Sequence, residues 1–314
     1  MTVGLNVIVI GCGISGLSCA RLLQEAGHRV TIWADKQSPH TTSDIAAAFW
    51  YPYRVFPVEK VKTWARDSFV AFAAIRDPDA GVLTKQAIEL LHVPAKDLWS
   101  LQLPGSRPAR ADELPPGYEH GQVFESYVIE IPRYMPWLHR AFIAAGGVVH
   151  HRQLESIDLA VQEADAVFHC SGLGARKLVD DASVHTLRGQ LVRVKNNGID
   201  RVIMDEQSEA AISYVVPRSE DVILGGTSDE DNEKLEADPT VTSAILDRCI
   251  ALEPRLRDAE VLGTQVGLRP CRPQVRVELE TVAGVPVIHN YGHGGAGITL
   301  SWGCAAEALR LLRF

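Results

Sequence analysis

Val7-Ile-Val-Ile-Gly-Cys-Gly-Ile-Ser-Gly16 is the stretch that decides the fold of this chain of 314 residues. Its β-branched apolar residues predict a buried strand, and the glycines after them predict a tight turn that opens a helix. Gly11 permits the turn, Gly13 lets the backbone approach a pyrophosphate, and Gly16 lets the helix pack on the strand. Such glycines can also serve packing alone. The residues around them decide between packing and the binding of a dinucleotide.

The residues that follow complete a strand–helix–strand unit. Residues 17–26 place apolar side chains on one helical face, and residues 29–34 form a second apolar run that ends at Asp35. In such a unit the pyrophosphate of a dinucleotide lies at the helix N-terminus, and the acid accepts hydrogen bonds from a ribose hydroxyl. Asp35 disfavours a 2′-phosphate, so NAD and FAD remain as candidate cofactors.

Composition excludes several classes of partner. A net charge of -8 and a pI near 5.8 disfavour nucleic acid and anionic lipid. The sequence shows neither a membrane span nor a cleavable leader, and its six cysteines lack paired or zinc-type spacing. We therefore expect free thiols, no metal and a cytoplasmic location. A homo-oligomer is compatible with the sequence, but no feature marks a pairing surface.

Polar and small residues after the first unit are candidates for completing a cofactor site. Thr41, Thr42 and Ser43 offer hydroxyl donors, although such a run is more often a loop or a helix cap. The alanines at 46–48 permit close approach of a flat ring system. The aromatic cluster at 49–53 lines the same pocket or belongs to the core.

A second strand with a glycine turn, Ala-Val-Phe-His-Cys-Ser-Gly-Leu-Gly, occupies residues 166–174. Many FAD proteins return a strand of this kind to the side of the dinucleotide, so the stretch favours flavin over NAD. His169 within it is expected to be a core histidine rather than a catalytic one.

Periodicity and turn residues predict the other elements. Helices are expected at 61–75, 131–145, 239–252 and 300–312, with Asp238 as the N-cap of the third. Strands are expected at 82–92, 148–151, 154–157, 191–194, 202–204, 212–216 and 222–224. Prolines and glycines predict irregular structure at 94–121.

Two arginines in Gly-Leu-Arg-Pro-Cys-Arg-Pro-Gln-Val-Arg, residues 267–276, each precede a proline that favours extended backbone. Residues an odd number apart on a strand face opposite ways, so Arg269 and Arg272 should not serve one site. A guanidinium on a stiff segment suits bidentate binding of a carboxylate, and a surface salt bridge is the alternative. Residues 287–299 then predict a strand, a glycine loop and a helix whose N-terminus can stabilise a reduced flavin.

Taken together, these segments resemble the D-amino-acid oxidase family of FAD enzymes. The resemblance rests on residues 288–297 with 302–305, on 267–270 and 188–190, on Ala34-Asp35 with Thr41-Thr42, and on the opening glycines. It implies a Rossmann-type α/β FAD-binding domain interleaved with an α+β substrate domain built on an antiparallel sheet. The FAD-binding domain is expected at 1–45, 141–186 and 266–314, and the substrate domain at 46–140 and 187–265.

The resemblance also implies roles for single residues. Arg269 clamps the substrate α-carboxylate, the hydroxyl of Tyr214 joins it, the Gly295 carbonyl receives the amine, and Tyr53 lines the pocket. Leu154 and Ser171 resemble positions at the adenosine end, and residues 293–299 face the flavin. The positions implied for non-covalent FAD are Gly11, Cys12, Gly13, Ile14, Ser15, Gly16, Asp35, Lys36, Thr41, Thr42, Ser43, Ala48, Phe49, Leu154, Ser171, Gly172, Arg269, His293, Gly294, Gly295, Gly297, Ile298 and Thr299.

The implied reaction passes a hydride from the α-carbon of a D-amino acid to flavin. Oxygen reoxidises the flavin, so the products are a 2-oxo acid, ammonia and hydrogen peroxide. Alignment of the substrate carries the rate, which makes His289 and His293 poor candidates for an acid or base.

Departures from the family pattern bear on specificity. The loop at 205–212 is short, Ala210 stands where animal enzymes carry a second tyrosine, and Ala296 replaces a bulkier residue. D-aspartate oxidases place arginines where this chain has Gln207 and Ser228. We therefore expect neutral or basic D-amino acids as substrates. The alternatives are a glycine- or sarcosine-type amine oxidase, a D-aspartate oxidase, and a flavin-binding protein without turnover, which the carboxylate clamp disfavours.

Overall fold

The computed structural model describes residues 4–96, 98–207 and 212–312, and its strands belong to one large mixed sheet. The strands are β1 (Asn6–Ile10), β2 (Arg29–Ala34), β3 (Val82–Leu91), β4 (Arg107–Pro108), β5 (His120–Ile129), β6 (Val148–His151), β7 (Ala166–His169), β8 (His185–Lys195), β9 (Val202–Asp205), β10 (Ser213–Pro217), β11 (Asp221–Gly225), β12 (Asp229–Glu230), β13 (Val261–Val282) and β14 (Val285–His293). Their order is β4-β5-β3-β9-β10-β11-β8-β13-β14-β7-β1-β2-β6, with β12 on β8.

Seven α-helices cover the described parts of this sheet: α1 (Ile14–Glu25), α2 (Val58–Ala74), α3 (Ile131–Ala144), α4 (Asp158–Glu163), α5 (Ala175–Leu178), α6 (Pro239–Leu252) and α7 (Gly297–Leu311). Short 3₁₀ helices are η1 (Thr42–Ile45), η2 (Pro78–Ala80), η3 (Trp99–Gln102), η4 (Ala111–Glu113), η5 (Gly172–Gly174), η6 (Pro254–Leu256) and η7 (Gly294–Ala296). In the described ranges no helix has the length and apolar character needed to cross a bilayer.

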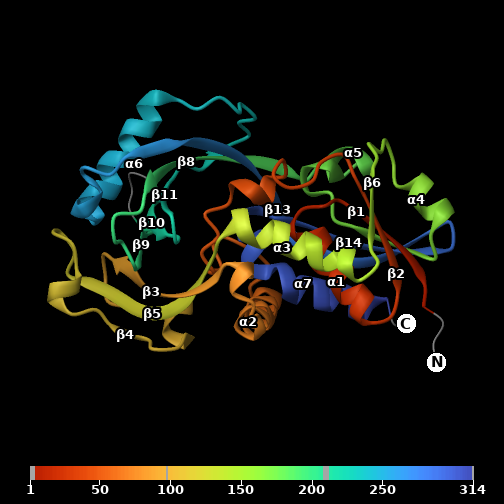
Figure 1. Cartoon of the computed structure of the whole chain (residues 1–314), viewed down its shortest axis with the longest axis horizontal. Helices are drawn as coiled ribbons and strands as arrows, with labels where there is room; N and C mark the ends of the chain where they lie inside the picture. Colours follow the sequence, from red (N-terminus) through yellow and green to blue (C-terminus); the bar gives the residue numbers. More distant parts are fainter. Residues whose placement is uncertain (1–3, 97, 208–211, 313–314) are drawn as a thin grey trace.

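The strands β14, β7, β1, β2 and β6 form a parallel layer with helices on both faces (Figure 1). Val7 and Val9 pack in one cluster with α1, α3 and α7, whereas Ile8 and Ile10 pack with α4 on the other face. An apolar run without alternation is what burial on both faces requires. The predicted strand–helix–strand unit is therefore confirmed.

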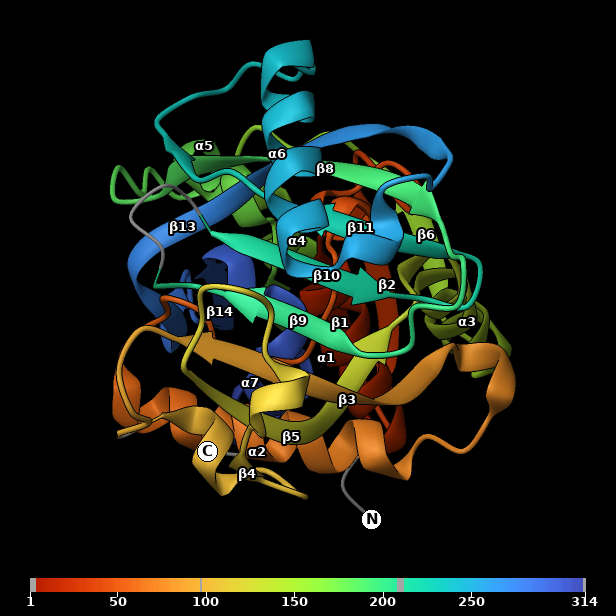
Figure 2. The ribbon, with the colours of Figure 1, turned by 90° about the vertical axis from the view of Figure 1, so that its left-hand side faces the viewer.

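The other half of the sheet is mainly antiparallel. β8, β11, β10 and β9 pair in antiparallel register, and β9 joins the β3–β5 hairpin through a parallel contact. Helix α6 lies across β8, β10 and β11, as Figure 2 shows, and buries Ile245 and Cys249 against them. The predicted fold class, a Rossmann-type layer combined with an antiparallel sheet, is confirmed.

One long strand joins the two halves. β13 has 22 residues; it pairs with β8 from Val261 to Cys271 and with β14 from Cys271 to Val282. Its register shifts between Cys271 and Arg276. The sheet is thus continuous from the parallel layer to the antiparallel one.

Two sequence expectations need correction. The strand expected at 154–157 is absent: Arg152 donates its amide to the Ala34 carbonyl, and the chain then leaves the sheet and enters α4. Leu154 and Ile157 still pack against the sheet, so their apolar character reflects burial from a loop. The strand β5 was not predicted, because its buried Gln122 and Ser126 interrupt the apolar pattern.

Candidate active site

A cavity of about 1270 Å³ opens at the carboxyl ends of the parallel strands and extends into the antiparallel half. Residues of the first glycine turn line one part of it, and residues of β8, β9, β10 and β13 line another. Ligands of open α/β sheets bind at this edge, where loops and helix N-termini converge. One cavity thus connects the two sets of residues that the sequence singled out.

The three glycines of the first turn have distinct physical roles. Gly11 has a φ of +108°, and a Cβ placed there would lie 2.5 Å from the Cys170 carbonyl oxygen. A Cβ on Gly16 would lie 1.9 Å from the Gly11 carbonyl oxygen, so α1 can approach β1 only with glycine here. A Cβ on Gly13 would meet only the Ser43 hydroxyl, at 3.1 Å. Gly13 therefore keeps space open on the cavity side.

The threonine–serine run contains both a cap and a direct contact with α1. Thr41 is the N-cap residue of η1, and the Asp44 carboxylate accepts hydrogen bonds from its backbone amide and hydroxyl, at 2.8 and 2.6 Å. The Ser43 hydroxyl accepts the Ile14 amide at 3.0 Å, which satisfies a donor at the start of α1. The cap interpretation is confirmed for Thr41, and all three side chains belong to residues that line the cavity.

A second helix N-terminus opens onto the same cavity. Gly294 has a φ of +55°, and α7 begins at Gly297 without an acidic residue in its first turn. His293, just before this turn, is buried; burial lowers its pKa to about 4. Its Nε2 has no hydrogen-bond partner in the described residues. A neutral ring at this place does not supply a positive charge.

Arg269 extends from β13 into the antiparallel end of the cavity. A Cβ on Gly189 of β8 would lie 2.4 Å from its Nη2, so the guanidinium rests against glycine backbone. Its Nη1 donates to the Thr227 carbonyl at 3.0 Å. The Arg269 guanidinium is therefore held from two sides, and its other N–H donors stay available.

Tyr214 reaches the same end of the cavity from β10. It pairs with Gly225 on β11, and a Cβ on that glycine would lie 1.9 Å from its ring. Burial raises the pKa of the Tyr214 phenol, and nearby Arg269 acts in the opposite direction. The phenol is neutral at physiological pH and can donate a hydrogen bond.

Gly295, in the glycine turn before α7, lies next to two residues of this end of the cavity. A Cβ placed on it would lie 3.4 Å from Cδ of Arg269 and 3.5 Å from the Tyr53 ring. The structure therefore brings Arg269, Tyr214, Gly295 and Tyr53 to one end of the cavity. Every residue predicted for cofactor binding also lines this cavity except Gly16, which lies where helix and strand pack. No contact tests the adenosine-end assignment of Leu154 and Ser171, and it stays a prediction.

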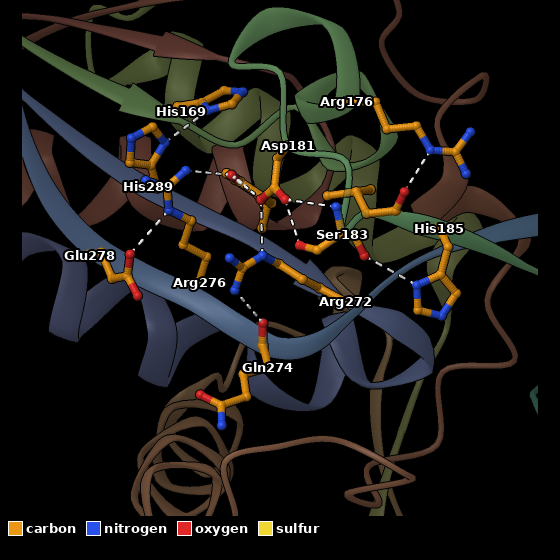
Figure 3. Close-up of polar contacts among 12 residues, drawn as sticks. His169, Arg176, Asp181, Ser183, His185, Arg272, Gln274, Arg276, Glu278 and His289 are labelled. Atoms are coloured by element: carbon orange, nitrogen blue, oxygen red, sulfur yellow. Dashed lines mark hydrogen bonds and ion pairs between the residues drawn. The ribbon is translucent and has the colours of Figure 1, made fainter.

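Arg272 belongs to a separate polar cluster, which Figure 3 shows. Its Nε donates to Asp181 at 2.9 Å, and Tyr291 donates its hydroxyl to the same carboxylate at 2.8 Å. Burial raises the pKa of Asp181, but hydrogen bonds from Ser183, Tyr291 and Arg272 outweigh it and lower the value overall. Arg272 is thus structural, in accord with its predicted separation from Arg269.

His169 belongs to a chain of polar contacts, of which Figure 3 shows the contact with His289. Its Nε2 contacts the Ser171 hydroxyl at 2.6 Å, its Nδ1 contacts Nδ1 of His289 at 3.0 Å, and Nε2 of His289 contacts Glu280 at 3.0 Å. Burial, followed by nearby His289 and Arg276, lowers the pKa of His169 to about 3. The imidazole is a neutral core group, as its sequence context suggested.

Comparison with known proteins places this architecture in a family. Residues 6–311 match the family model described as FAD dependent oxidoreductase (DAO). The chain belongs to this family. It is 46% identical over 310 residues to D-amino-acid oxidase of Rubrobacter xylanophilus, covering 98% of this chain and 95% of that protein. It is 36% identical over 324 residues to human D-aspartate oxidase, covering 98% and 94%.

Solved structures show the same fold at low identity. Glycine oxidase from Geobacillus kaustophilus superposes with a TM-score of 0.82 at 18% identity, covering 99% of this chain and 95% of that one. L-proline dehydrogenase from P. horikoshii gives 0.77 at 12% identity, covering 100% and 94%.

FAD is the cofactor of this oxidoreductase family, held non-covalently, and the residues of this chain fit it. Gly13 leaves room for a pyrophosphate, and neither α1 nor α7 carries an acid in the first turn to repel one. The described residues hold no cluster of three or more groups that could bind a metal ion.

Sequence reasoning missed several residues of this FAD-dependent oxidoreductase that line the cavity. Arg152 lies over the Trp33 ring at 4.0 Å, close to the end of β2. Gly189 entered the sequence analysis only as part of residues 188–190. Its contact with Arg269 depends on how β8 and β13 pair, which the sequence does not show. Glu206 gave no signal, because an acid in a loop is ordinarily solvated.

Proposed function

We propose that this FAD-dependent oxidoreductase converts neutral or basic D-amino acids into 2-oxo acids, ammonia and hydrogen peroxide. The observation that carries the proposal is the convergence of Arg269, Tyr214, Gly295 and Tyr53 at one end of the cofactor cavity. The chain is 38–46% identical to three D-amino-acid oxidases over 98% of its length, which supports the proposal.

Each of these residues has a defined task in binding. The Arg269 guanidinium binds the α-carboxylate, since its contact with Thr227 leaves further N–H donors available. The Tyr214 hydroxyl donates to the same carboxylate, and the Gly295 carbonyl accepts the substrate amine. Tyr53 packs beside Gly295 and limits the pocket on that side.

Catalysis then depends on orientation more than on proton transfer by side chains. When bound, FAD supplies the hydride acceptor, and its reoxidation by oxygen gives the peroxide. Arg269 and Gly295 fix both ends of the amino-acid group, which restricts the direction of the α-hydrogen. His293 is neutral and buried, and His289 bonds to His169 behind the cavity, so neither is assigned an acid or base role.

The proposal extends to organisation and location. The parallel strands β1, β2, β6, β7 and β14 all fall within 1–45, 141–186 and 266–314, which supports assigning these segments to FAD and 46–140 and 187–265 to substrate. All six cysteines are free thiols, which supports a reducing compartment, and we place the protein in the cytoplasm.

Neutral or basic substrates are favoured over acidic ones by the charges at the substrate end. Among the described residues of β8, β9, β10 and β13 that line the cavity, Arg269 is the sole arginine or lysine. It is committed to the α-carboxylate, so these strands offer no second cation to an acidic substrate side chain. Gln207 and Ser228 are neutral; Ala210 lies outside the described residues, so the expectation about a second tyrosine stays a prediction.

The test is peroxide release from purified, FAD-loaded protein on D- and L-amino acids, glycine and sarcosine. We expect peroxide with neutral and basic D-amino acids and none with their L-enantiomers. Turnover of glycine or sarcosine alone would assign the enzyme to the amine-oxidase alternative. Saturation by D-aspartate at ordinary concentrations would contradict the proposed specificity, and flavin that stays oxidised anaerobically with every substrate would indicate a binding protein.

A further inference from the structure

Glu206 is an acidic side chain at the substrate end of the cavity that the mechanism above does not use. It follows β9 directly, and both Glu206 and Met204 line the cavity. Met204 pairs with Tyr214 across the strands. Burial, and then the charge of Glu206, raises the pKa of Tyr51, another residue that lines the cavity.

Glu206 differs from the other acids around it because it lacks a partner. The Glu89 carboxylate accepts hydrogen bonds from Tyr51 at 2.7 Å and from Ser100 at 2.5 Å. Asp205 accepts one from Tyr118 at 2.6 Å. No hydrogen bond or ion pair joins Glu206 to any residue that the structure describes. Glu206 is half-buried, and a carboxylate in such a place gains free energy when a ligand supplies the missing partner.

The surrounding charges make this position attractive to a cation. Burial, then the neighbouring charge of Glu89, raises the pKa of Glu206 to about 8, and Asp205 adds to the effect. The charge of Arg54 lowers the pKa of Glu206. Arg54 is exposed, and its guanidinium lies 5.3 Å from the Tyr53 ring centre. A cationic ligand beside Glu206 would favour the ionised carboxylate.

We propose that Glu206 receives the ammonium or guanidinium of a basic D-amino-acid side chain and so gives the enzyme a preference for basic substrates. The inference rests on the proposed function, because it requires the α-carboxylate to be bound by Arg269. The side chain of such a substrate then extends along the β9–β10 wall toward Glu206. A charge-assisted hydrogen bond there compensates the unpaired acid.

The experiment compares charged substrates with neutral substrates of the same shape. The kcat/KM is measured for D-arginine against D-citrulline and for D-lysine against D-norleucine, in the FAD-loaded wild type and in Glu206→Gln. We expect the wild type to prefer the charged member of each pair by about tenfold or more, and the variant to lose that preference. The neutral substrates should change by no more than about twofold, within the range of a lost surface contact.

Two further variants sharpen the result. Glu119→Gln removes an exposed acid that does not line the cavity, and it should leave every ratio unchanged. Glu206→Lys should reverse the preference, raising kcat/KM for D-glutamate relative to D-glutamine. The absorbance of bound FAD reports folding of each variant.

Three outcomes would overturn the inference. An unchanged charged-to-neutral ratio in Glu206→Gln would mean that Glu206 does not meet the substrate. Equal losses on charged and neutral members, with Glu206→Lys inactive, would assign it a structural role. Absence of turnover with every D-amino acid in the wild type would instead reject the proposed function, on which this inference depends.

Discussion

Two large polar side chains at the proposed substrate site rest on glycines of neighbouring strands. Arg269 lies over Gly189, and Tyr214 lies over Gly225. A side chain at either glycine would occupy the space that the guanidinium or the ring now fills. The orientation of the guanidinium and the phenol, the groups proposed to bind the carboxylate, is therefore set partly by glycines.

Gly189→Ala tests this at a place where the clash falls on the end of a flexible arginine. The new methyl group would lie 2.4 Å from Nη2 of Arg269, so it would displace the guanidinium while the backbone stays in place. We expect KM for D-amino acids to rise by about tenfold to 100-fold with FAD still bound. Steady-state kinetics and flavin fluorescence measure the two effects. Loss of FAD instead would show that the glycine supports the fold.

Arg269→Ala removes the proposed carboxylate clamp itself. We expect bound FAD to be retained and kcat/KM to fall by about 100-fold or more, because the substrate anion loses its charged partner. Arg257→Ala, at an exposed arginine outside the cavity, is the matched control and should have no effect. Kinetics like those of the wild type in Arg269→Ala would refute the assignment.

Residue-level prediction from sequence succeeded where the backbone itself constrains a side chain. The prolines after Arg269 and Arg272 keep both on extended backbone, and the structure separates the two arginines as the spacing requires. The position of Glu206 could not be predicted in this way. Whether a loop acid is solvated or withdrawn from water depends on Glu89 and Met204, which lie elsewhere in the chain.

At the scale of elements, the first glycine turn combines two separable requirements. Gly16 is needed for α1 to pack on β1, whereas a Cβ on Gly13 would meet no backbone and only the Ser43 hydroxyl, at 3.1 Å. Gly13 has a φ of -78°, which alanine adopts without strain. The two positions therefore allow packing and cofactor binding to be tested apart.

Gly13→Ala should fold normally but bind FAD more weakly, since the added methyl group would stand in the space open to the pyrophosphate. Gly16→Ala should fail to give folded protein, because its Cβ would lie 1.9 Å from the Gly11 carbonyl oxygen. Circular dichroism reports folding, and fluorescence titration of apoprotein reports FAD affinity. Equal FAD affinity in Gly13→Ala and wild type would show that the glycine is not at the cofactor.

Elements with a local cause were predicted well. Asp238 caps α6 by accepting the Thr240 amide at 2.8 Å, and α6 has the predicted bounds. α1 and α7 begin earlier than predicted, at Ile14 and Gly297, because the ends of the glycine turns are already helical. The error at 154–157 has a nonlocal cause, since only the packing of Leu154 against the sheet explains an apolar residue in a loop.

For the whole molecule, buried neutral histidines couple stability to pH. The pKa of His293 is lowered by burial from 6.5 to about 4, so the unfolded chain binds a proton that the folded chain does not. The titration of His293 therefore costs no stability above pH 6.5, and it lowers the free energy of unfolding as the pH drops toward 4.

His293→Asn removes this titration. The difference in unfolding free energy between wild type and variant should change by about 1.4 kcal/mol per pH unit between these values, with the wild type losing stability on acidification. Denaturant titrations at pH 7 and pH 5 measure it. A difference that does not vary with pH would mean that the ring is charged or solvated in the folded state.

The strand order of the whole sheet was beyond what the sequence predicts. The strand–helix–strand unit at the N-terminus and the runs of β8 to β11 are local, and both were predicted. The return of residues 166–169 to the first strand–helix–strand unit was expected, and β7 pairs with β1. The parallel contact of β3 with β9, between residues more than a hundred positions apart, was not expected. Such pairings depend on which apolar faces remain uncovered after the local units form.

The length of β13 also has a mechanical consequence. This strand pairs with β8 and then, past a register shift between Cys271 and Arg276, with β14, so one strand ties the parallel layer to the antiparallel half of the described sheet. The two sides should then behave as one rigid body on the timescale of turnover. Substrate entry and product exit must use local motions of loops and side chains around the cavity mouth, so viscosity and loop sequence, more than domain closure, should set the rate of exchange.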